Sequence, residues 1–90
     1  MDQIEQNLKI YKEYSNYITN NKNYLQQSNY CSCIKCKSTF LSTLVTSFRY
    51  RMTTAVCPQC NEDVIIPHSL YIPSNNDLDR WYENIYVDAT

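Results

Sequence analysis

The chain has 90 residues, of which 43% are apolar and 19% charged, and its net charge is −1. These values exclude a disordered chain and, over the molecule as a whole, the broad basic surface of a non-specific nucleic-acid binder. A chain this short forms one domain, residues 1–90, with a marginal core that a metal or disulfide staple would reinforce.

No stretch approaches the roughly 20 apolar residues that span a membrane, and the polar, acidic start MDQIEQNLKI differs from a secretory signal peptide. We therefore expect a cytoplasmic protein with no membrane partner. In that reducing compartment, cysteines paired as Cys-x-x-Cys bind metal more often than they form disulfides.

Residues 1–28 form the first predicted element, an N-terminal helical segment. An apolar stripe recurs there at helical spacing, formed by Ile4, Leu8, Tyr11 and Ile18. The run 19–23 is a weak point, because Asn and Thr are poor helix formers. The pattern predicts either one helix over about residues 3–27 or two helices broken near Asn20.

Residues 31–67 form the second predicted element, a zinc ribbon of short β-hairpins. The stretch 40–50 is rich in Val, Thr, Leu and Phe, and the short apolar run 64–66 is closed by Pro67. Because these runs flank two cysteine pairs, we expect hairpins that carry the cysteines at their tips.

Residues 74–87 form the third predicted element, an amphipathic helix. Ser74 can cap it, with Asp77 as the acidic partner three residues on. One wide apolar face follows, made of Leu78, Trp81, Tyr82, Ile85 and Tyr86. We expect this face to pack in the core. The alternative is a protein partner, bound through Leu78, Trp81, Tyr82 and Tyr86.

Together these elements predict an α+β fold in which zinc-ribbon-like β-hairpins are flanked by an N-terminal helix and a C-terminal amphipathic helix.

The clearest chemical signal is two cysteine pairs separated by twenty residues. Cys33 and Cys36 form the first pair, and Cys57 and Cys60 form the second. Each Cys-x-x-Cys turn directs two sulfurs at one centre while backbone N–H groups face the thiolates, so two turns supply the tetrahedral sulfur set that Zn²⁺ accepts. We predict one structural Zn²⁺ at these four cysteines, with iron as the next candidate.

Two further side chains could join this site. Cys31 could replace Cys33, and His68, the only histidine, could complete a set of three cysteines and one histidine. We expect a spare, partly buried thiol and a surface or core histidine instead.

In the second pair, Pro58 stiffens the turn, and Asn61 follows it where a left-handed backbone is often needed.

The segment Cys57-Pro-Gln-Cys60 also resembles the active-site turn of a dithiol oxidoreductase, in which a helix N-terminus lowers the pKa of one thiol. Here a β-like run follows the turn, and a second cysteine pair is available, so a metal site is favoured. Four cysteines close the coordination shell, whereas a catalytic zinc keeps an open position. We therefore expect no enzymatic activity.

The segments around the cysteines resemble a family of small uncharacterised bacterial cytoplasmic proteins with a zinc-ribbon-like pattern. The matching residues are Ser28, Cys31, Cys33, Cys36 and Phe40, then Thr54, Ala55, Val56, Cys57, Pro58, Cys60 and Asp63, and finally Trp81 and Tyr82. The resemblance covers about residues 24–82 and implies a helix–ribbon–helix layout that binds metal, and it does not point to any activity. Ser32 and Asn61 replace family glycines. If those glycines have positive φ, Asn61 tolerates it and Ser32 would be strained.

Three functions compete on this sequence. The first is a protein-interaction or adaptor module that uses the aromatic C-terminal helix or the ribbon surface. The second is a nucleic-acid-binding zinc ribbon, with Tyr50 as a stacking surface and the basic side chains Lys35, Lys37, Arg49 and Arg51. The third is a thiol oxidoreductase that uses Cys57 or Cys60. We favour them in that order.

Overall fold

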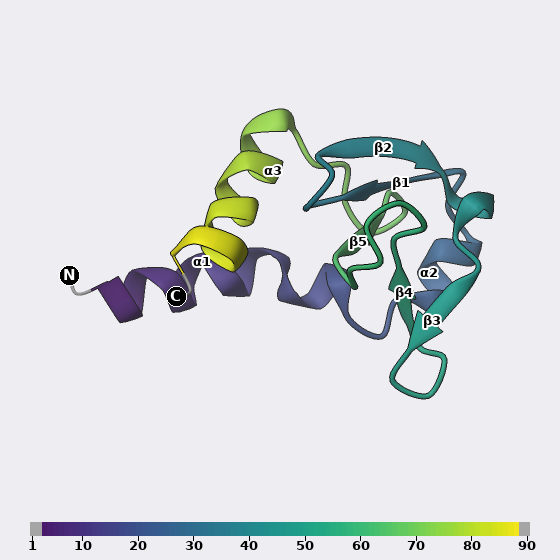
Figure 1. Ribbon diagram of the computed structural model, residues 1–90, viewed down its shortest axis with the longest axis horizontal. Coiled ribbons are helices and arrows are strands. Elements are labelled where there is room, and N and C mark those ends of the chain that lie inside the picture. Colours follow the sequence, from purple (N-terminus) through teal and green to yellow (C-terminus); the bar gives the residue numbers. More distant parts are fainter. Residues whose placement is uncertain (1–2, 89–90) are drawn as a thin grey trace.

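The computed structural model describes residues 3–88, and it confirms the predicted α+β class: a helical arm joins a compact region of two small sheets (Figure 1). The helices are α1 (Gln3–Ile18), α2 (Lys22–Gln26) and α3 (Asn75–Tyr82), which continues as the π-helical segment η2 (Glu83–Val87). The strands are β1 (Tyr30–Cys33), β2 (Ser38–Leu41), β3 (Ser47–Arg49), β4 (Thr54–Val56) and β5 (Ile65–Pro67), with a 3-10 turn η1 (Ser42–Leu44) after β2.

The N-terminal helical segment is broken, so the second of the two predicted alternatives is confirmed. Asn20 has a left-handed backbone, with φ of 51°, which cannot continue a right-handed helix. Its N–H donates to Thr54 Oγ1 (3.1 Å), and the N–H of Lys22 donates to the carbonyl of Thr53 (3.0 Å). The break therefore turns α2 back against β4.

The strands form two antiparallel sheets. β1 lies at the centre of a three-stranded sheet in the order β2-β1-β5, and β3 and β4 form a second, two-stranded sheet. The β-rich stretch 40–50 is not one strand, because the N–H of Ser42 donates to the carbonyl of Asn29 (3.0 Å) and the chain turns through η1 before β3. The first cysteine pair does lie at a hairpin tip. The second lies between β4 and β5, which belong to different sheets, so that part of the hairpin prediction is wrong.

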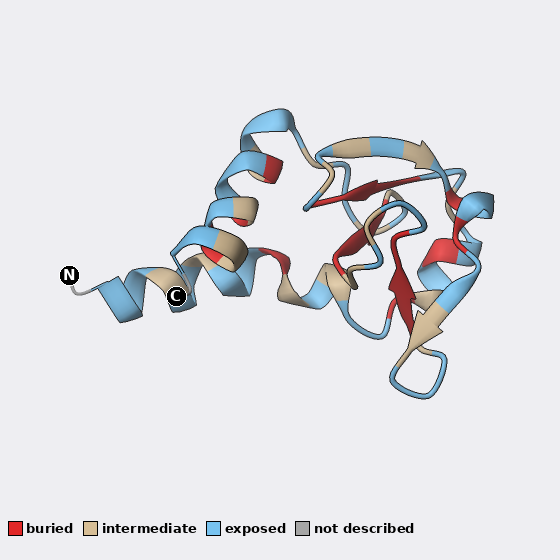
Figure 2. Cartoon of the chain, in the orientation of Figure 1, coloured by how far each residue is buried: buried red, intermediate tan, exposed pale blue. Residues whose placement is uncertain are grey.

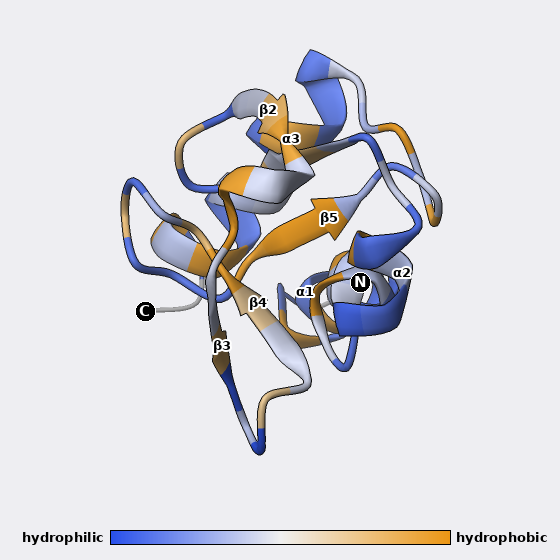
Figure 3. Cartoon of the chain, turned by 90° about the vertical axis from the view of Figure 1, so that its right-hand side faces the viewer, coloured by the Kyte–Doolittle hydropathy of each residue, from blue (hydrophilic) through white to orange (hydrophobic). Residues whose placement is uncertain are grey.

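The core lies between these sheets and the helices. Figure 2 shows buried residues along β1, β4 and β5, and Figure 3 shows that β5 is strongly apolar. One hydrophobic cluster joins all layers, and its members include Tyr14, Leu25, Ile34, Val45, Ala55, Val64, Ile65, Ile66, Leu78 and Trp81. Within residues 3–88, no helix combines the length and the apolar character needed to cross a membrane.

The C-terminal helix begins as predicted. Ser74 Oγ accepts the N–H of Asp77, and the Asp77 carboxylate accepts the N–H of Ser74, each at 3.1 Å. The expectation of core packing is confirmed for Leu78 and Trp81, both of which are buried. The centroid of the Tyr14 ring lies 5.7 Å from that of Trp81, and the Trp81 Nε1–H donates to Glu13 at 3.1 Å.

Asn21 joins the helical break to both sheets. Its side chain is fully buried. Its Nδ2 donates to the carbonyls of Ile65 (2.8 Å) and Tyr17 (3.0 Å), and its Oδ1 accepts the N–H of Ala55 (2.9 Å). Because Ala55 lies in β4 and Ile65 in β5, one side chain connects the two sheets.

We predict that Asn21→Ala lowers the free energy of unfolding by about 2–4 kcal/mol, because it leaves buried backbone groups of Ala55 and Ile65 without partners. Urea denaturation with metal present measures this. Asn23→Ala, at an exposed site nearby, is the control and should change stability by less than about 0.5 kcal/mol. An Asn21→Ala variant as stable as the control would contradict the assignment.

Candidate metal centre

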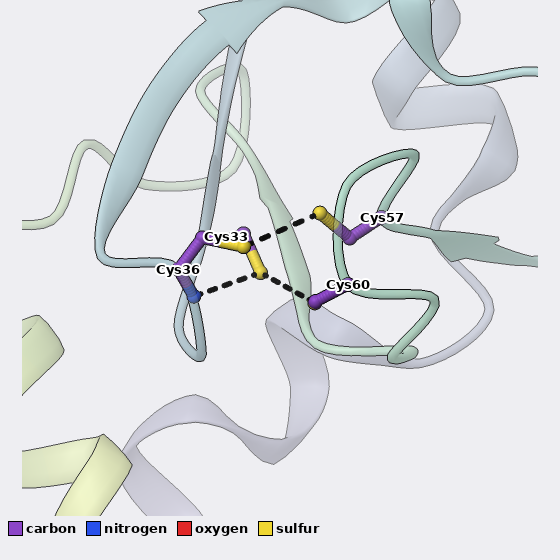
Figure 4. Close-up of side chains that lie close together, drawn as sticks. All are labelled: Cys33, Cys36, Cys57 and Cys60. Atoms are coloured by element: carbon purple, nitrogen blue, oxygen red, sulfur yellow. Dashed lines mark hydrogen bonds between the residues drawn. The ribbon is translucent and has the colours of Figure 1, made fainter.

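Four cysteine sulfurs from two separate loops lie together (Figure 4). The Sγ atoms of Cys33, Cys36, Cys57 and Cys60 all lie within 4.8 Å of one another. The Cys33 and Cys60 sulfurs are 3.7 Å apart, and the Cys36 and Cys57 sulfurs are 3.8 Å apart. A sulfur tetrahedron with metal–sulfur bonds of about 2.3 Å has edges of about 3.8 Å. The four thiolates therefore fit one metal ion, and their separations exceed the roughly 2.05 Å of a disulfide.

The pairing of β1 with β5 brings the two loops together. β1 ends at Cys33, whose partner in β5 is Ile65, and the N–H of Ile34 donates to the carbonyl of Val64 at 3.1 Å. The loop 57–64 leads directly into β5, so the same pairing places it beside the turn 33–37. The N–H of Cys57 closes this loop by donating to the carbonyl of Glu62 (2.9 Å).

The two cysteine turns share one backbone pattern. The carbonyl of Cys33 accepts the N–H of Lys37 (2.8 Å), and the carbonyl of Cys57 accepts the N–H of Asn61 (2.9 Å). Lys37 and Asn61 are both left-handed, with φ of 54° and 63°, so the conformation expected of Asn61 is confirmed.

Backbone N–H groups face the first sulfur of each turn. The N–H of Cys36 points at Cys33 Sγ, and the N–H of Gln59 points at Cys57 Sγ, each at 3.4 Å. Such donors stabilise thiolate rather than thiol. Both turns are thus shaped to hold metal-binding thiolates.

Burial and hydrogen bonding act in opposite directions on the pKa values of the thiols in the cluster. Burial raises the pKa of the Cys33 thiol well above its usual range, and burial is also the main cause that raises the pKa of Cys36 to about 11. At Cys57, burial is again the largest single effect, and it raises the pKa. The N–H groups of Cys60 and Gln59 and the neighbouring thiols together outweigh it, so the pKa of Cys57 is lowered overall. A cation at the centre would displace the remaining protons and stabilise all four thiolates.

Cys31 and His68 lie outside the cluster. Cys31 is fully buried, and burial raises the pKa of its thiol to about 11, so it behaves as a small apolar side chain. His68 Nε2 lies 2.8 Å from Ser32 Oγ, which lies 2.8 Å from Thr39 Oγ1.

Ser32 sits in strand β1 and is not among the residues with positive φ, so the backbone strain considered for Ser32 does not arise.

The first cysteine turn also contacts the C-terminal helix. Lys37 Nζ lies 2.9 Å from the Asp79 carboxylate and 4.6 Å from the centroid of the Tyr82 ring. Lys35 Nζ lies 5.5 Å from the centroid of the Tyr86 ring. The turn that holds two sulfurs therefore also holds the last helix of the protein.

Sequence reasoning missed the role of Lys37. A signal was present, because Lys37 follows Cys33 by four residues as Asn61 follows Cys57, and a shared turn predicts a left-handed residue at both positions. No local signal pairs its side chain with Asp79 and Tyr82, since that contact depends on where the C-terminal helix packs.

Comparison of the chain with models of known protein families, with characterised proteins and with solved structures finds no match. The resemblance of the cysteine segments to small bacterial proteins therefore stays a prediction.

We predict that Cys36→Ser and Cys60→Ser each lose the bound metal, because three sulfurs no longer complete the tetrahedron. Elemental analysis after gel filtration with a competing chelator measures this. Cys31→Ala is the matched control and should keep the wild-type metal content. Metal retained by Cys60→Ser, or lost from Cys31→Ala, would contradict this ligand set.

Proposed function

We propose that the protein is a small zinc-binding module that presents a surface to a protein partner, with a structural site at Cys33, Cys36, Cys57 and Cys60. The observation that carries the proposal is the convergence of four sulfurs within 4.8 Å from two loops. A set of four thiolates favours Zn²⁺, which accepts tetrahedral sulfur ligands without a geometric penalty. Its binding energy, on the order of ten kcal/mol in small zinc modules, would then stabilise the fold.

A structural role suits this centre better than catalysis. Four thiolates leave no coordination position for water or substrate, which a catalytic zinc requires. The oxidoreductase alternative needs a free thiol beside a helix N-terminus, whereas Cys57 and Cys60 lie in a loop between two strands. Free thiols of this kind persist in a reducing compartment, so we place the protein in the cytoplasm.

The aromatic C-terminal helix offers little surface to a partner. Leu78 and Trp81 are buried within the protein, and the Tyr82 and Tyr86 rings lie against the lysines of the first cysteine turn. Of the two partner surfaces predicted from the sequence, the ribbon surface is the one that we retain.

The most distinctive part of that surface is the hairpin tip, defined as Tyr50, Arg51 and Met52. All three side chains are exposed, and the loop projects from the end of the β3–β4 hairpin (Figure 1). All three residues have left-handed backbones, with φ of 54°, 61° and 67°, at a cost of roughly 1–2 kcal/mol each for a residue with a Cβ. Tyr, Arg and Met are enriched in protein interfaces, and strained backbone concentrates at functional sites.

The nucleic-acid alternative receives less support. Carboxylates face three of the four basic side chains of the ribbon, in the pairs Lys35–Glu62 (3.5 Å), Lys37–Asp79 (2.9 Å) and Arg49–Asp63 (3.7 Å). Charges paired in this way are poorly available to phosphates, which supply most of the affinity in non-specific nucleic-acid binding. A protein partner therefore remains our first choice.

We predict that Arg51→Gly raises the free energy of unfolding by about 1 kcal/mol, because glycine adopts positive φ without steric cost. Denaturation of the metal-loaded protein measures this. A fall in stability would show that the tip backbone is not strained.

The partner is tested with tagged, metal-loaded protein used to recover binding proteins from cells. We expect the combined change Tyr50→Ala and Met52→Ala to lower recovery of the partner at least about tenfold, as for interface anchors. Tyr24→Ala, an exposed tyrosine on α2, is the control and should leave recovery unchanged. Equal recovery by the tip variant would exclude the hairpin tip, and recovery of no partner by the wild type would contradict an interaction module.

A further inference from the structure

Helix α1 carries an exposed apolar stripe on its N-terminal half. The side chains of Ile4, Leu8 and Tyr11 are 71%, 54% and 48% exposed, although all three are large and apolar. In Figure 1 this half of α1 extends beyond the sheets, and in Figure 2 it is coloured mostly as exposed. Inside the protein, α1 instead uses a different face, on which Tyr14 is buried and donates its hydroxyl proton to Asn84.

The stripe has the geometry of a helix-pairing surface. A recess of about 260 Å³ lies along it, lined by Ile4, Asn7, Leu8, Tyr11 and Asn84. The four lining residues of α1 follow the spacing i, i+3, i+4, i+7. In a coiled coil, four residues at this spacing form the hole into which a side chain of the facing helix inserts.

Two side chains of opposite charge lie beside the stripe. Glu5 and Lys12 are seven residues apart, so they lie two turns apart on the same side of α1. If two copies of α1 cross antiparallel with Leu8 facing Leu8, Glu5 of each copy lies beside Lys12 of the other. In a parallel pair, the two copies of Glu5 and of Lys12 would lie on opposite sides of the contact and could not pair in this way. The charges thus favour the antiparallel orientation.

From this geometry we infer that a second copy of this chain covers the stripe, through an antiparallel α1–α1 contact centred on Leu8. Ile4 of one copy then packs against Tyr11 of the other, and Leu8 enters the recess of the facing helix. The surface is unsuited to anionic lipid, because α1 has two lysines and two glutamates, whereas membrane-surface helices have a basic polar face. This inference goes beyond the proposed function and does not depend on which metal is bound.

The contact is small. Three apolar side chains from each copy cover much less than the about 800 Å² per partner of a standard interface. We therefore expect a weak dimer that forms as the concentration of metal-loaded protein rises from about 10 μM to about 1 mM. Sedimentation equilibrium over this range measures the association.

The apolar part of the contact is tested by Leu8→Glu. This variant should remain monomeric over the whole range. Leu44→Glu is the matched control, because Leu44 is also 54% exposed but lies in η1, and it should associate like the wild type. A wild type that stays monomeric throughout, or equal loss of association in the two variants, would overturn the inference. Binding of the wild type to anionic vesicles without self-association would also overturn it.

The orientation is tested by charge reversal. Glu5→Lys and Lys12→Glu should each weaken association about fivefold, because both symmetry-related pairs become repulsive. Both changes in one chain should restore it, and so should an equimolar mixture of the two single variants. The mixture leaves the charges within each chain unaltered, so its recovery can come only from contact between copies. A mixture that associates no better than either variant alone would contradict the antiparallel contact.

Discussion

Four cysteine sulfurs from two loops that are distant in the sequence meet within 4.8 Å of one another in this protein, close enough to bind one metal ion. Backbone pairing alone gives a three-stranded sheet centred on β1 and a separate hairpin of β3 and β4. A two-stranded hairpin on its own is at best marginally stable in water. The cysteine cluster adds a link between the turn 33–37 and the loop 57–64, and it lies where the two sheets approach each other. One ion bound there would replace the repulsion among four thiolates with attraction, and it would join both sheets.

Other contacts extend this link to the helices. Lys37 connects the first cysteine turn to the C-terminal helix through Asp79 and Tyr82. Asn21 connects the helical break to β4 and β5 through buried hydrogen bonds. Little of the apolar face of α3 is therefore left for a partner, and the surfaces that we propose for recognition are the hairpin tip and the N-terminal half of α1.

Features with a local cause could be predicted from the sequence. The Cys-x-x-Cys turns, the left-handed Asn61 and the Ser74–Asp77 cap all follow from residue type and spacing. The sequence located a possible break near Asn20 but could not decide between one helix and two, because that choice depends on contacts with Thr53 and Thr54. Features with a tertiary cause could not be predicted: the η1 turn within the stretch 40–50, the position of the second cysteine pair between two sheets, and the contacts of Lys37. Each depends on how strands and helices that are distant in the sequence pack against one another.

The most direct test is the amide spectrum of the purified protein by ¹H–¹⁵N NMR, before and after the metal is removed by a chelator under reducing conditions. If the four thiolates hold the two sheets together through an ion, removal should collapse the dispersed signals of β1, β4 and β5, and one equivalent of Zn²⁺ should restore them. A spectrum unchanged after verified removal of the metal would contradict the account.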